Sequence, residues 1–367
     1  MKIGIITYHN ALNAGAILQA YALQSLLKQF GHNVEFIDFA PPRNYKINDF
    51  IAKSPSKIIH KWIDFFNYKK YSSKKKSFNK VLNLSAQKYY TLEELKNNPP
   101  IYDIYIAGSD QIWNFTTFIS PAYMLSFVPK GKKKIAYAAS MGQCNLDPKL
   151  YETFKRYISD FNAISIREKN GVEFLKKLVQ NQKDIIQVLD PTLLINADIY
   201  EKIIDPKIIN HKPFICTYIL SDLDLDNKMI ISCIKQEKKL EIINLRNPDT
   251  GVHLSKDQNI IVTPYQWLSY IKYSNFIICS SFHAVVFALI FHKPFIALVP
   301  PGCKNKNGNA RINSLLESID LAERIIYHFH EESLKNIINK AIPWEIIDSK
   351  IKSQRITSIN FILNNLK

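Results

Sequence analysis

The hydrophobic pattern of the first forty residues predicts a strand, a helix and a second strand. Residues 2–8 form a run of apolar and β-branched side chains. Over residues 16–30 apolar side chains return at helical spacing, until Gly31 interrupts the pattern. Residues 33–39 then alternate apolar and polar side chains, as strands do. A β-α-β unit of this kind predicts a parallel sheet with a right-handed crossover.

The same succession of short apolar runs and helical stretches continues in two series. The first series predicts a helix over 169–179 and strands at 101–107, 134–139, 163–166 and 184–189. The second begins after residue 213, with strands expected at 214–219, 241–245, 259–262, 275–279 and 294–298. Two such series predict an α/β protein with two Rossmann-like domains facing a cleft, as in GT-B enzymes. We place these domains at 1–200 and 201–345, and expect the helix within 346–367 to pack back on the first domain.

The charge of the chain is strongly positive. It has 48 lysine and arginine residues against 32 acidic ones, a net charge of +16, and an expected insertion at about 43–90 carries Lys69, Lys70, Lys74, Lys75 and Lys76. An anionic partner, such as a phosphorylated small molecule or a membrane surface, would explain this charge. A lysine-rich composition that merely solvates the surface would explain it equally well. Nucleic acid is not expected, because the aromatic residues lack the spacing of RNA-binding motifs.

Cysteine spacing and hydropathy indicate a soluble cytoplasmic protein. The five cysteines include no C-x-x-C pair, which argues against a zinc site and a disulfide framework. The apolar start is too short for a signal peptide. The longest apolar stretch, 276–291, has polar side chains at its centre and falls short of a membrane span. We expect neither a metal nor a bound cofactor.

Polar residues follow the predicted strands, at the sheet edge where ligands of open parallel sheets bind. His283 follows strand 275–279 and begins an apolar helix, so it is either a satisfied core histidine or a general acid beside an anion-binding helix start. Arg167 suits either a bound anion or an ion pair with Glu168. The other candidates at these edges are His9, Asn13, Gly15, Asp110, Gln111, Ser140, Ser280 and Ser281.

Several of these candidates have an ordinary structural explanation as well. Asp110 either caps a helix or binds a sugar hydroxyl. Asn13 and Gly15 suit a phosphate-binding loop or a common strand-to-helix turn. The chain has no G-x-G-x-x-G and no G-K-[ST] motif. Its D-x-D pattern at Asp222 and Asp224 either holds a nucleotide-bound Mg²⁺ or caps the following helix.

Six segments, taken in order, resemble the polysaccharide pyruvyltransferase family along nearly the whole chain. They are I-T-Y-H-N-A-L-N-A-G-A-I-L-Q-A-Y-A-L-Q (6–24), G-S-D-Q-I-W-N (108–114), A-Y-A-A-S-M-G (136–142), I-S-I-R-E (164–168), V-L-D-P-T (188–192) and S-F-H-A-V-V-F-A-L-I-F-H-K-P-F (281–295). The resemblance implies a GT-B-like fold and phosphoenolpyruvate as donor co-substrate. The implied product carries pyruvate as a cyclic ketal on two sugar hydroxyls, formed during capsule or exopolysaccharide assembly.

The resemblance also implies roles for individual residues. His283 would protonate the methylene carbon of the donor, and Arg167 would grip its carboxylate or phosphate. Ser281 stands where many members carry an arginine, and Arg311 is the candidate to replace that charge. Ser280, Ser281, Asn13 and Gly15 complete the expected donor site. The expected acceptor contacts are His9, Asp110, Gln111 and Ser140, on a saccharide that is linked to a polyprenyl phosphate at the inner face of the membrane.

Two other functions remain open from the sequence. A GT-B glycosyltransferase would bind the diphosphate of a nucleotide sugar at the helix after Ser280. It would need a ribose-binding carboxylate late in the second domain, where Glu317 and Asp320 are the candidates. A catalytically silent subunit of a glycan-assembly complex would tolerate loss of Arg167 or His283, and both are present.

Overall fold

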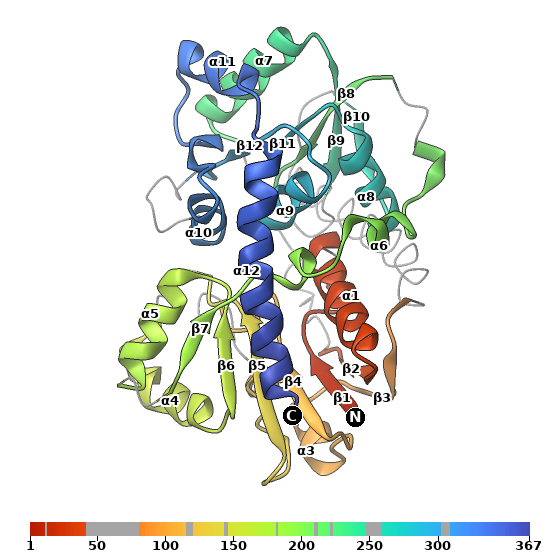
Figure 1. Ribbon diagram of the computed structural model, residues 1–367, viewed down its shortest axis with the longest axis vertical. Coiled ribbons are helices and arrows are strands. Elements are labelled where there is room, and N and C mark those ends of the chain that lie inside the picture. Colours follow the sequence, from red (N-terminus) through yellow and green to blue (C-terminus); the bar gives the residue numbers. More distant parts are fainter. Residues whose placement is uncertain are drawn as a thin grey trace, which may run out of the picture.

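Two parallel β-sheets, each flanked by helices, form the framework of the protein (Figure 1). The computed structural model describes residues 1–11, 13–41, 81–114, 120–142, 146–180, 183–208, 212–220, 223–246, 258–301 and 309–367. The predicted fold class, two Rossmann-like domains of the GT-B type, is confirmed. The lysine cluster at residues 69–76 lies outside the described residues.

The first sheet has the order β3-β2-β1-β4-β5-β6-β7. Every adjacent pair is parallel, and the central strands are almost completely buried, as expected when helices cover both faces. The strands are β1 Lys2–Ile6, β2 Asn33–Phe39, β3 Leu84–Tyr89, β4 Ile104–Ala107, β5 Lys133–Ala139, β6 Ala163–Ile166 and β7 Ile185–Gln187.

The second sheet has the order β10-β9-β8-β11-β12-β13 and is also parallel throughout. Its strands are β8 Phe214–Tyr218, β9 Glu241–Arg246, β10 Gln258–Ile261, β11 Phe276–Cys279, β12 Phe295–Leu298 and β13 Ile325–Ile326. All five strands predicted for this half are present, within two residues at each end. The two-residue edge strand β13 was not predicted.

The helices begin where the sequence supplies caps or polar turns. Asn13 caps α1 by accepting a hydrogen bond from the backbone of Gly15, and Thr263 forms a capping box at α8. The α-helices are α1 Ala14–Gln29, α3 Leu92–Asn97, α4 Tyr151–Ser159, α5 Lys169–Leu178, α6 Ala197–Glu201, α7 Leu225–Lys238, α8 Pro264–Tyr273, α9 Phe282–Ile290, α10 Ala310–Ser318, α11 Glu331–Asn339 and α12 Trp344–Asn365. Short 3₁₀ helices are η3 Pro121–Met124, η4 Pro148–Leu150, η5 Pro191–Leu193, η6 Pro206–Ile208 and η7 Ala322–Arg324.

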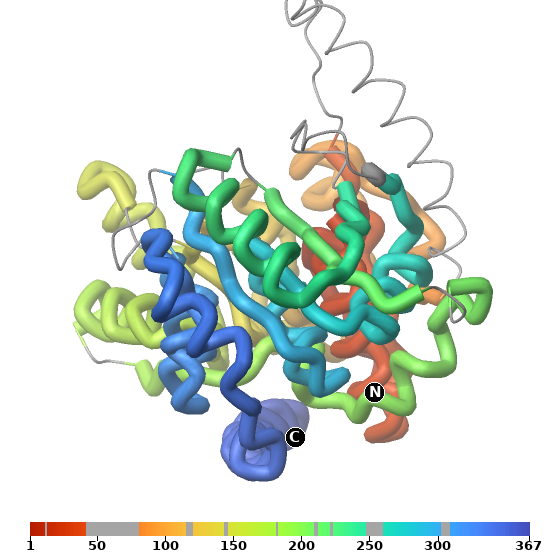
Figure 2. The backbone as a smooth tube through the Cα atoms, turned by 90° about the horizontal axis from the view of Figure 1, so that it is seen from above, coloured from red at the N-terminus to blue at the C-terminus, as the bar shows by residue number. Residues whose placement is uncertain are grey.

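Helix α12 runs along both halves of the molecule (Figure 1). Toward the first sheet, Ser358 Oγ accepts a hydrogen bond from the backbone of Leu189 at 2.9 Å. Toward the second, Asp348 pairs with His292, whose ring stacks on Trp344. Seen from above, the helix lies at the outer edge of the molecule (Figure 2). It therefore ties the two halves together along one side.

The two halves also share a hydrophobic core. Helix α1 of the first half packs on α8 and α9 of the second, and one cluster of buried side chains includes residues of both sheets. The carboxyl end of β6 and the start of α9 are thereby held close together. These are the two places where the sequence analysis expected its main site residues.

One part of the sequence analysis needs revision. The expected insertion at 43–90 contains an edge strand, β3, which was missed because its sequence, L-S-A-Q-K-Y, is polar and largely exposed. For the D-x-D pattern, the capping alternative holds at Asp224, which accepts a hydrogen bond from the backbone of Asn227 at the start of α7. Asp222 lies outside the described residues.

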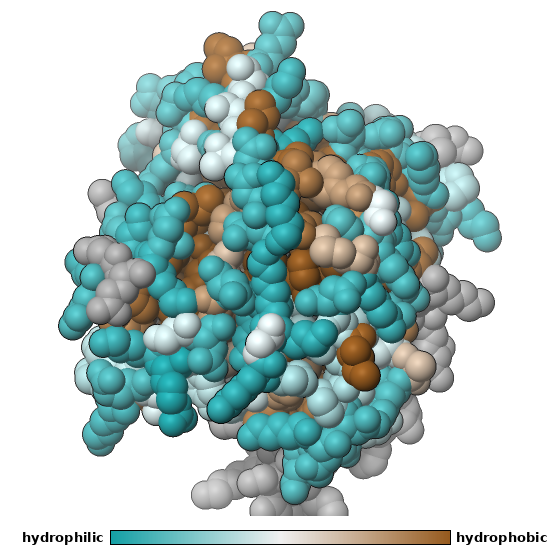
Figure 3. Space-filling model, turned by 60° about the horizontal axis from the view of Figure 1, so that its bottom comes forward, coloured by the Kyte–Doolittle hydropathy of each residue, from teal (hydrophilic) through white to brown (hydrophobic). Residues whose placement is uncertain are grey.

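The described surface is mainly polar. Over the face drawn in Figure 3, hydrophilic residues predominate and apolar ones form separate patches. None of the described helices combines the length and the apolar character that crossing a membrane requires.

Candidate active site

Arg167 follows β6 and is enclosed by three carboxylates. Its Nη1 donates to Asp190 Oδ2 at 2.5 Å and its Nε to Glu168 Oε1 at 3.3 Å, while Nη2 lies 3.9 Å from Asp110 Oδ1. Its guanidinium lies 4.3 Å from the centre of the Phe282 ring, in cation–π geometry. Burial alone would lower the pKa of Arg167, but the three carboxylates outweigh burial and raise it. Arg167 is therefore a permanent cation inside the protein.

Asp190 is the central acceptor of the site. Its Oδ1 accepts hydrogen bonds from the backbone and the hydroxyl of Thr192, at 3.0 and 2.6 Å. Its Oδ2 accepts from Arg167 and from Ser109 Oγ at 3.3 Å, and lies 3.6 Å from Nε2 of His283. Burial alone would raise the pKa of Asp190. The imidazole, the guanidinium and the Thr192 hydroxyl outweigh it and hold the pKa well below its ordinary value.

His283 lies in the first turn of α9, between the two halves. It is 4% exposed, and its Nε2 makes no hydrogen bond within the described part of the chain. Its ring packs against α1 so closely that a Cβ on Gly15 would overlap it. The side chain of Ser281 does not cap the helix, so the first N–H groups of α9 have no side-chain partner from the cap position. The histidine is thus held in place by packing, with its Nε2 3.6 Å from Asp190 Oδ2.

Glu168 links Arg167 to the segment after β5. Ser140 donates a hydrogen bond of 2.5 Å to Glu168 Oε1, and the backbone of Met141 donates to Oε2 at 3.4 Å. Ser140 therefore belongs to the cluster, although its hydroxyl is already engaged inside the protein.

Arg311 enters the site from the first turn of α10. With the amide oxygen of Gln111 facing the guanidinium, Gln111 accepts hydrogen bonds from Nη1 and Nη2 at 2.8 and 3.2 Å. Burial and the positive charge of Arg167 lower the pKa of Arg311. Among the described carboxylates, none forms an ion pair with it. Of the two guanidinium groups in the cluster, Arg311 therefore has the charge that is less committed to carboxylates.

Asp110 lies beside Arg167 but does not cap a helix. Its φ is +69°, it forms an isolated bridge with Ala139, and the residues that follow it are turns. The helix-cap interpretation of Asp110 is therefore wrong. Burial and the carboxylate of Asp110 raise the pKa of Tyr8 to about 12.

Three other predicted residues have partners outside this cluster. Ser280 Oγ accepts a hydrogen bond from the backbone of Leu220 at 2.9 Å, and Asn13 caps α1. His9 uses both ring nitrogens, toward Thr7 O at 3.2 Å and Asp38 Oδ1 at 3.1 Å. Of the predicted site residues, the structure thus brings together Arg167, His283, Arg311, Asp110, Gln111, Ser140 and Gly15.

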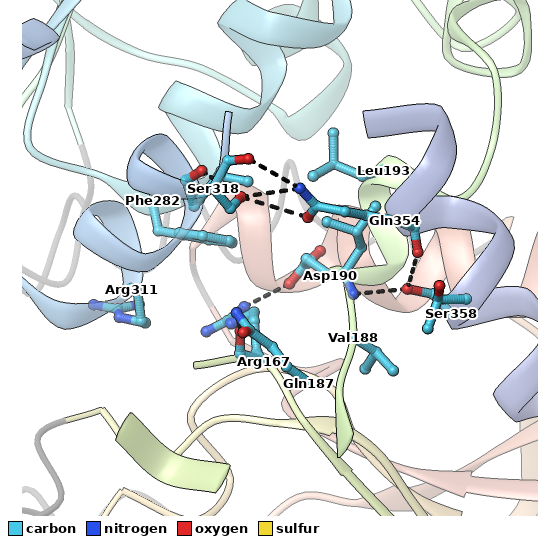
Figure 4. Close-up of a pocket in the computed structure, with 13 residues that line it drawn as sticks. Arg167, Gln187, Val188, Asp190, Leu193, Phe282, Arg311, Ser318, Gln354 and Ser358 are labelled. Atoms are coloured by element: carbon cyan, nitrogen blue, oxygen red, sulfur yellow. Dashed lines mark hydrogen bonds and ion pairs between the residues drawn. The ribbon is translucent and has the colours of Figure 1, made fainter. Parts of the chain in front are cut away.

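A cavity of about 180 Å³ adjoins the cluster (Figure 4). Arg167, Asp190, Phe282 and Arg311 line one part of it, and residues of α10 and α12 line the rest. No three acidic, histidine or cysteine side chains lie close enough to hold a metal ion within the described segments. The side chains gathered at the charged part of the cavity can bind an anion through arginine.

The comparisons with known proteins identify the family. The family model described as polysaccharide pyruvyl transferase matches residues 13–300, well over half of the chain. The protein belongs to the polysaccharide pyruvyl transferase family. The resemblance inferred from six sequence segments is thereby confirmed, and with it a transferase of polysaccharide biosynthesis.

Solved structures with a similar fold include sugar-nucleotide enzymes. The UDP-N-acetylglucosamine 2-epimerase from Rickettsia bellii has 12% identity and a TM-score of 0.50, covering 99% of this chain and 96% of its own. The glycosyltransferase SnogD from Streptomyces nogalater has 11% identity and a TM-score of 0.46, covering 100% of this chain and 99% of its own. The UDP-GlcNAc 2-epimerase from Neisseria meningitidis has 12% identity and a TM-score of 0.44, covering 99% of this chain and 100% of its own. At these identities the likeness concerns the fold alone. No curated protein matches the chain.

The sequence reading missed two residues that organise this family member's site. Asp190 was quoted within V-L-D-P-T but given no role, although it directly follows a predicted strand. Phe282 was passed over as part of an apolar helix, yet it packs on Arg167. A carboxylate at the carboxyl end of a buried strand was the available signal for Asp190.

Proposed function

We propose that this transferase moves the enolpyruvyl group of phosphoenolpyruvate onto two hydroxyls of a sugar, forming a pyruvate ketal during capsule or exopolysaccharide assembly. Membership of the family supports pyruvyl transfer as the class of reaction. The observation that carries the proposal is the buried group of His283, Asp190 and Arg167. In this group the imidazole and the guanidinium share the carboxylate of Asp190. No cofactor besides the donor co-substrate is required.

Donor binding rests on arginine and on the start of α9. Arg311 has no ion-pair partner among the described carboxylates, and Nη2 of buried Arg167 has no hydrogen bond there either. The two guanidinium groups lie on the same side of the cavity (Figure 4). A carboxylate or phosphate between them would also face the uncapped N–H groups of α9. In this proposal Arg311 supplies the charge that Ser281 lacks, and Asn13 and Gly15 support the donor site through α1.

His283 is proposed to be the general acid. It transfers a proton to the methylene carbon, which becomes the methyl group, and the central carbon becomes cationic. A sugar hydroxyl forms a C–O bond to that carbon. The C–O bond to phosphate then breaks, and the second hydroxyl closes the ketal. Of the two hydroxyl protons, one restores His283 and the other leaves on inorganic phosphate, so atoms and charge balance. Asp190 stabilises the protonated imidazole before transfer.

On the acceptor side, Asp110, Gln111 and Ser140 surround Arg167 and are proposed to meet the sugar hydroxyls. His9 is the weakest of the acceptor candidates, because Thr7 and Asp38 already occupy both of its nitrogens.

The geometry of the site gives little support to the glycosyltransferase alternative. Asp320, one candidate for ribose binding, forms an ion pair with Lys350 of α12. Glu317 is exposed and lies six residues along α10 from Arg311, about 9 Å at 1.5 Å per residue. Neither carboxylate belongs to the cluster around Arg167.

The deciding experiment incubates the purified protein with phosphoenolpyruvate and a panel of free and lipid-linked saccharides. We expect acceptor-dependent phosphate release together with the mass gain of one pyruvyl ketal on the glycan. His283→Ala is the control and should release no phosphate. Turnover with a nucleotide sugar, and none with phosphoenolpyruvate, would contradict the proposal.

We also propose that the acceptor is carried on a polyprenyl phosphate and that the protein works in the cytoplasm, bound peripherally to the inner face of the membrane. The net charge of +16 supports attraction to an anionic surface. Replacing Lys74, Lys75 and Lys76 by Gln should raise KM for a lipid-linked acceptor and leave a short soluble analogue unaffected. Equal effects on both acceptors would favour ordinary surface lysines.

A further inference from the structure

The cavity beside the cluster has a charged end and an uncharged remainder. Thirteen residues line it, and its three charged ones, Arg167, Asp190 and Arg311, lie toward one end in Figure 4, opposite Gln354 and Ser358. The uncharged lining residues come from the segment after β7 and from α9, α10 and α12: Gln187, Val188, Leu189, Leu193, Phe282, Leu315, Ser318, Gln354, Thr357 and Ser358. Of the residues that line the cavity, the proposed donor contacts use only those at the charged end.

The uncharged part is built of apolar walls with a polar mouth. Leu193, Phe282 and Leu315 are buried, at 1, 4 and 6% exposure. Ser318 and Thr357 are exposed, and the amide of Gln354 donates to Ser318 Oγ at 3.2 Å across the gap between α12 and α10. Small-molecule sites commonly combine apolar walls with a few polar groups that fix orientation. Polar side chains of α10 and α12 therefore line this part of the cavity.

A buried polar group points to a ligand at the inner end. Arg167 is 5% exposed, and its Nη2 is buried without a hydrogen-bond partner among the described residues. An unsatisfied buried donor costs free energy unless a ligand or water supplies the acceptor. The cavity that Arg167 lines is where such an acceptor can come from.

The size and chemistry of the cavity select the ligand. Its volume of about 180 Å³ is far above the ~10–15 Å³ that a cavity needs to hold one water molecule, which leaves room for a sugar ring. A pyranose has apolar C–H faces and a rim of hydroxyls that both donate and accept. Leu193, Phe282 and Leu315 match the faces, while Gln354 and Thr357 match the rim.

We propose that this cavity binds one neutral sugar residue of the acceptor, with its apolar face on Phe282 and Leu315 and its hydroxyls toward Thr357 and Gln354. The assignment of this sugar as acceptor rests on the proposed pyruvyl transfer. Arg167 and Asp190 line the cavity, so the inner end of the sugar lies beside the proposed donor contacts and near Asp110, the acceptor candidate next to Arg167. Helix α12, which lies beyond the residues matched by the family model, thereby becomes part of the acceptor site.

The test fills the mouth of the cavity. Thr357→Trp places a large side chain at the lining, and Ser353→Trp is the matched control, because Ser353 is exposed on α12 and does not line the cavity. Binding of free glucose, galactose, mannose and N-acetylglucosamine is followed by saturation-transfer NMR without donor. We expect at least one of them to bind the wild-type protein and Ser353→Trp, and to lose binding by at least about tenfold in Thr357→Trp.

Kinetics with phosphoenolpyruvate then separates this inference from the proposed function. KM for the saccharide acceptor should rise at least about tenfold in Thr357→Trp, with KM for phosphoenolpyruvate within about twofold of wild type. A rise in the donor KM alone would assign the cavity to the donor and overturn the inference. Unchanged binding of every sugar would show that the cavity holds only water. In either case acceptor-dependent phosphate release by the wild type would leave the proposed reaction standing.

Discussion

Two histidines of this protein are buried beside an aspartate, and their surroundings differ in what they leave free. His9, after β1, is 3% exposed and uses both ring nitrogens, toward the carbonyl of Thr7 and the carboxylate of Asp38. His283, at the start of α9, is 4% exposed, and its Nε2 lies 3.6 Å from Asp190 without a hydrogen bond. A fully satisfied histidine holds structure together. A histidine whose ring nitrogen approaches a carboxylate without a hydrogen bond can still transfer a proton.

The two histidine rings also differ in which parts of the molecule pack against them. The His9 ring stacks on Phe36 within the first domain. The His283 ring lies against Gly15 and meets Phe282 edge-on, so both halves of the molecule contribute to its position. Burial alone therefore does not separate a structural histidine from a catalytic one. If His283 is the general acid, as proposed, the number of hydrogen-bonded ring nitrogens and the origin of the neighbouring residues make that distinction.

The largest expected effect comes from removing the two histidines one at a time. His283→Ala should lower kcat by about two to four orders of magnitude, the usual contribution of a general acid. His9→Gln should keep most of the turnover and instead lower the free energy of unfolding by about 1–3 kcal/mol, because buried partners lose their hydrogen bonds. Steady-state kinetics and urea unfolding measure the two effects. Equal losses of kcat in both variants would contradict the distinction drawn here.

Asp190 should show the next largest effect, on stability as well as on rate. Asp190→Asn removes the partner of Arg167 and should cost about 3 kcal/mol of unfolding free energy at pH 7, as is typical when one member of a buried ion pair is lost. It should also lower kcat, since the imidazole of His283 loses its carboxylate.

The stability that the Asp190 carboxylate contributes should decrease as the pH falls. The pKa of Asp190 is lower in the folded protein than its ordinary value of 3.8, so the ionised carboxylate stabilises the fold at higher pH. This stability is lost progressively as the pH falls below about 4. The difference between wild type and Asp190→Asn in urea unfolding should therefore shrink from pH 7 to pH 3. A difference that stayed constant with pH would show that the charge of Asp190 does not contribute.

The contrast between the histidines also shows what a sequence can reveal. The alternating β and α patterns predicted both sheets, because strand and helix periods are local properties of the chain. Arg167 and His283 were found because both follow predicted strands, at the edge where parallel sheets bind ligands. His9 met the same criterion and was placed at the acceptor for that reason. Only its contact with Asp38, 29 residues away, shows that it is already paired.

Other features depend on contacts that no local pattern encodes. The role of Asp190 arises from Arg167 and His283, which lie 23 and 93 positions away in the sequence. Strand β3 is polar, and pairing with β2 rather than its own hydrophobicity makes it a strand. The close approach of Gly15 to His283 joins the two halves of the chain. Tertiary packing decides each of these.

Arg167 and Arg311 can be compared in the same way, because Arg167 is paired with carboxylates and Arg311 forms no ion pair with the described ones. Arg311→Ala should raise KM for phosphoenolpyruvate by about 10- to 100-fold, corresponding to the loss of a charge-assisted hydrogen bond. Arg167→Lys should weaken donor binding by about tenfold, since lysine cannot reproduce the planar fork that joins Asp190 and Glu168. Initial rates at varied donor concentration measure both. An unchanged donor KM in Arg311→Ala would end its assignment as the substitute for an arginine at position 281.

The smallest expected effect tests the packing that holds His283. Gly15 lies in the first turn of α1, where alanine is favoured over glycine by up to about 1 kcal/mol on helix propensity alone. An added methyl group would overlap Cβ, Cγ and Nδ1 of His283, so we expect Gly15→Ala to do the opposite. It should lower the melting temperature by a few degrees and kcat several-fold, because the imidazole is pushed away from Asp190. Thermal unfolding and kinetics on the same preparation give both numbers. A higher melting temperature with unchanged kcat would mean that α1 does not position His283, and the packing difference between the two histidines would then carry no weight for catalysis.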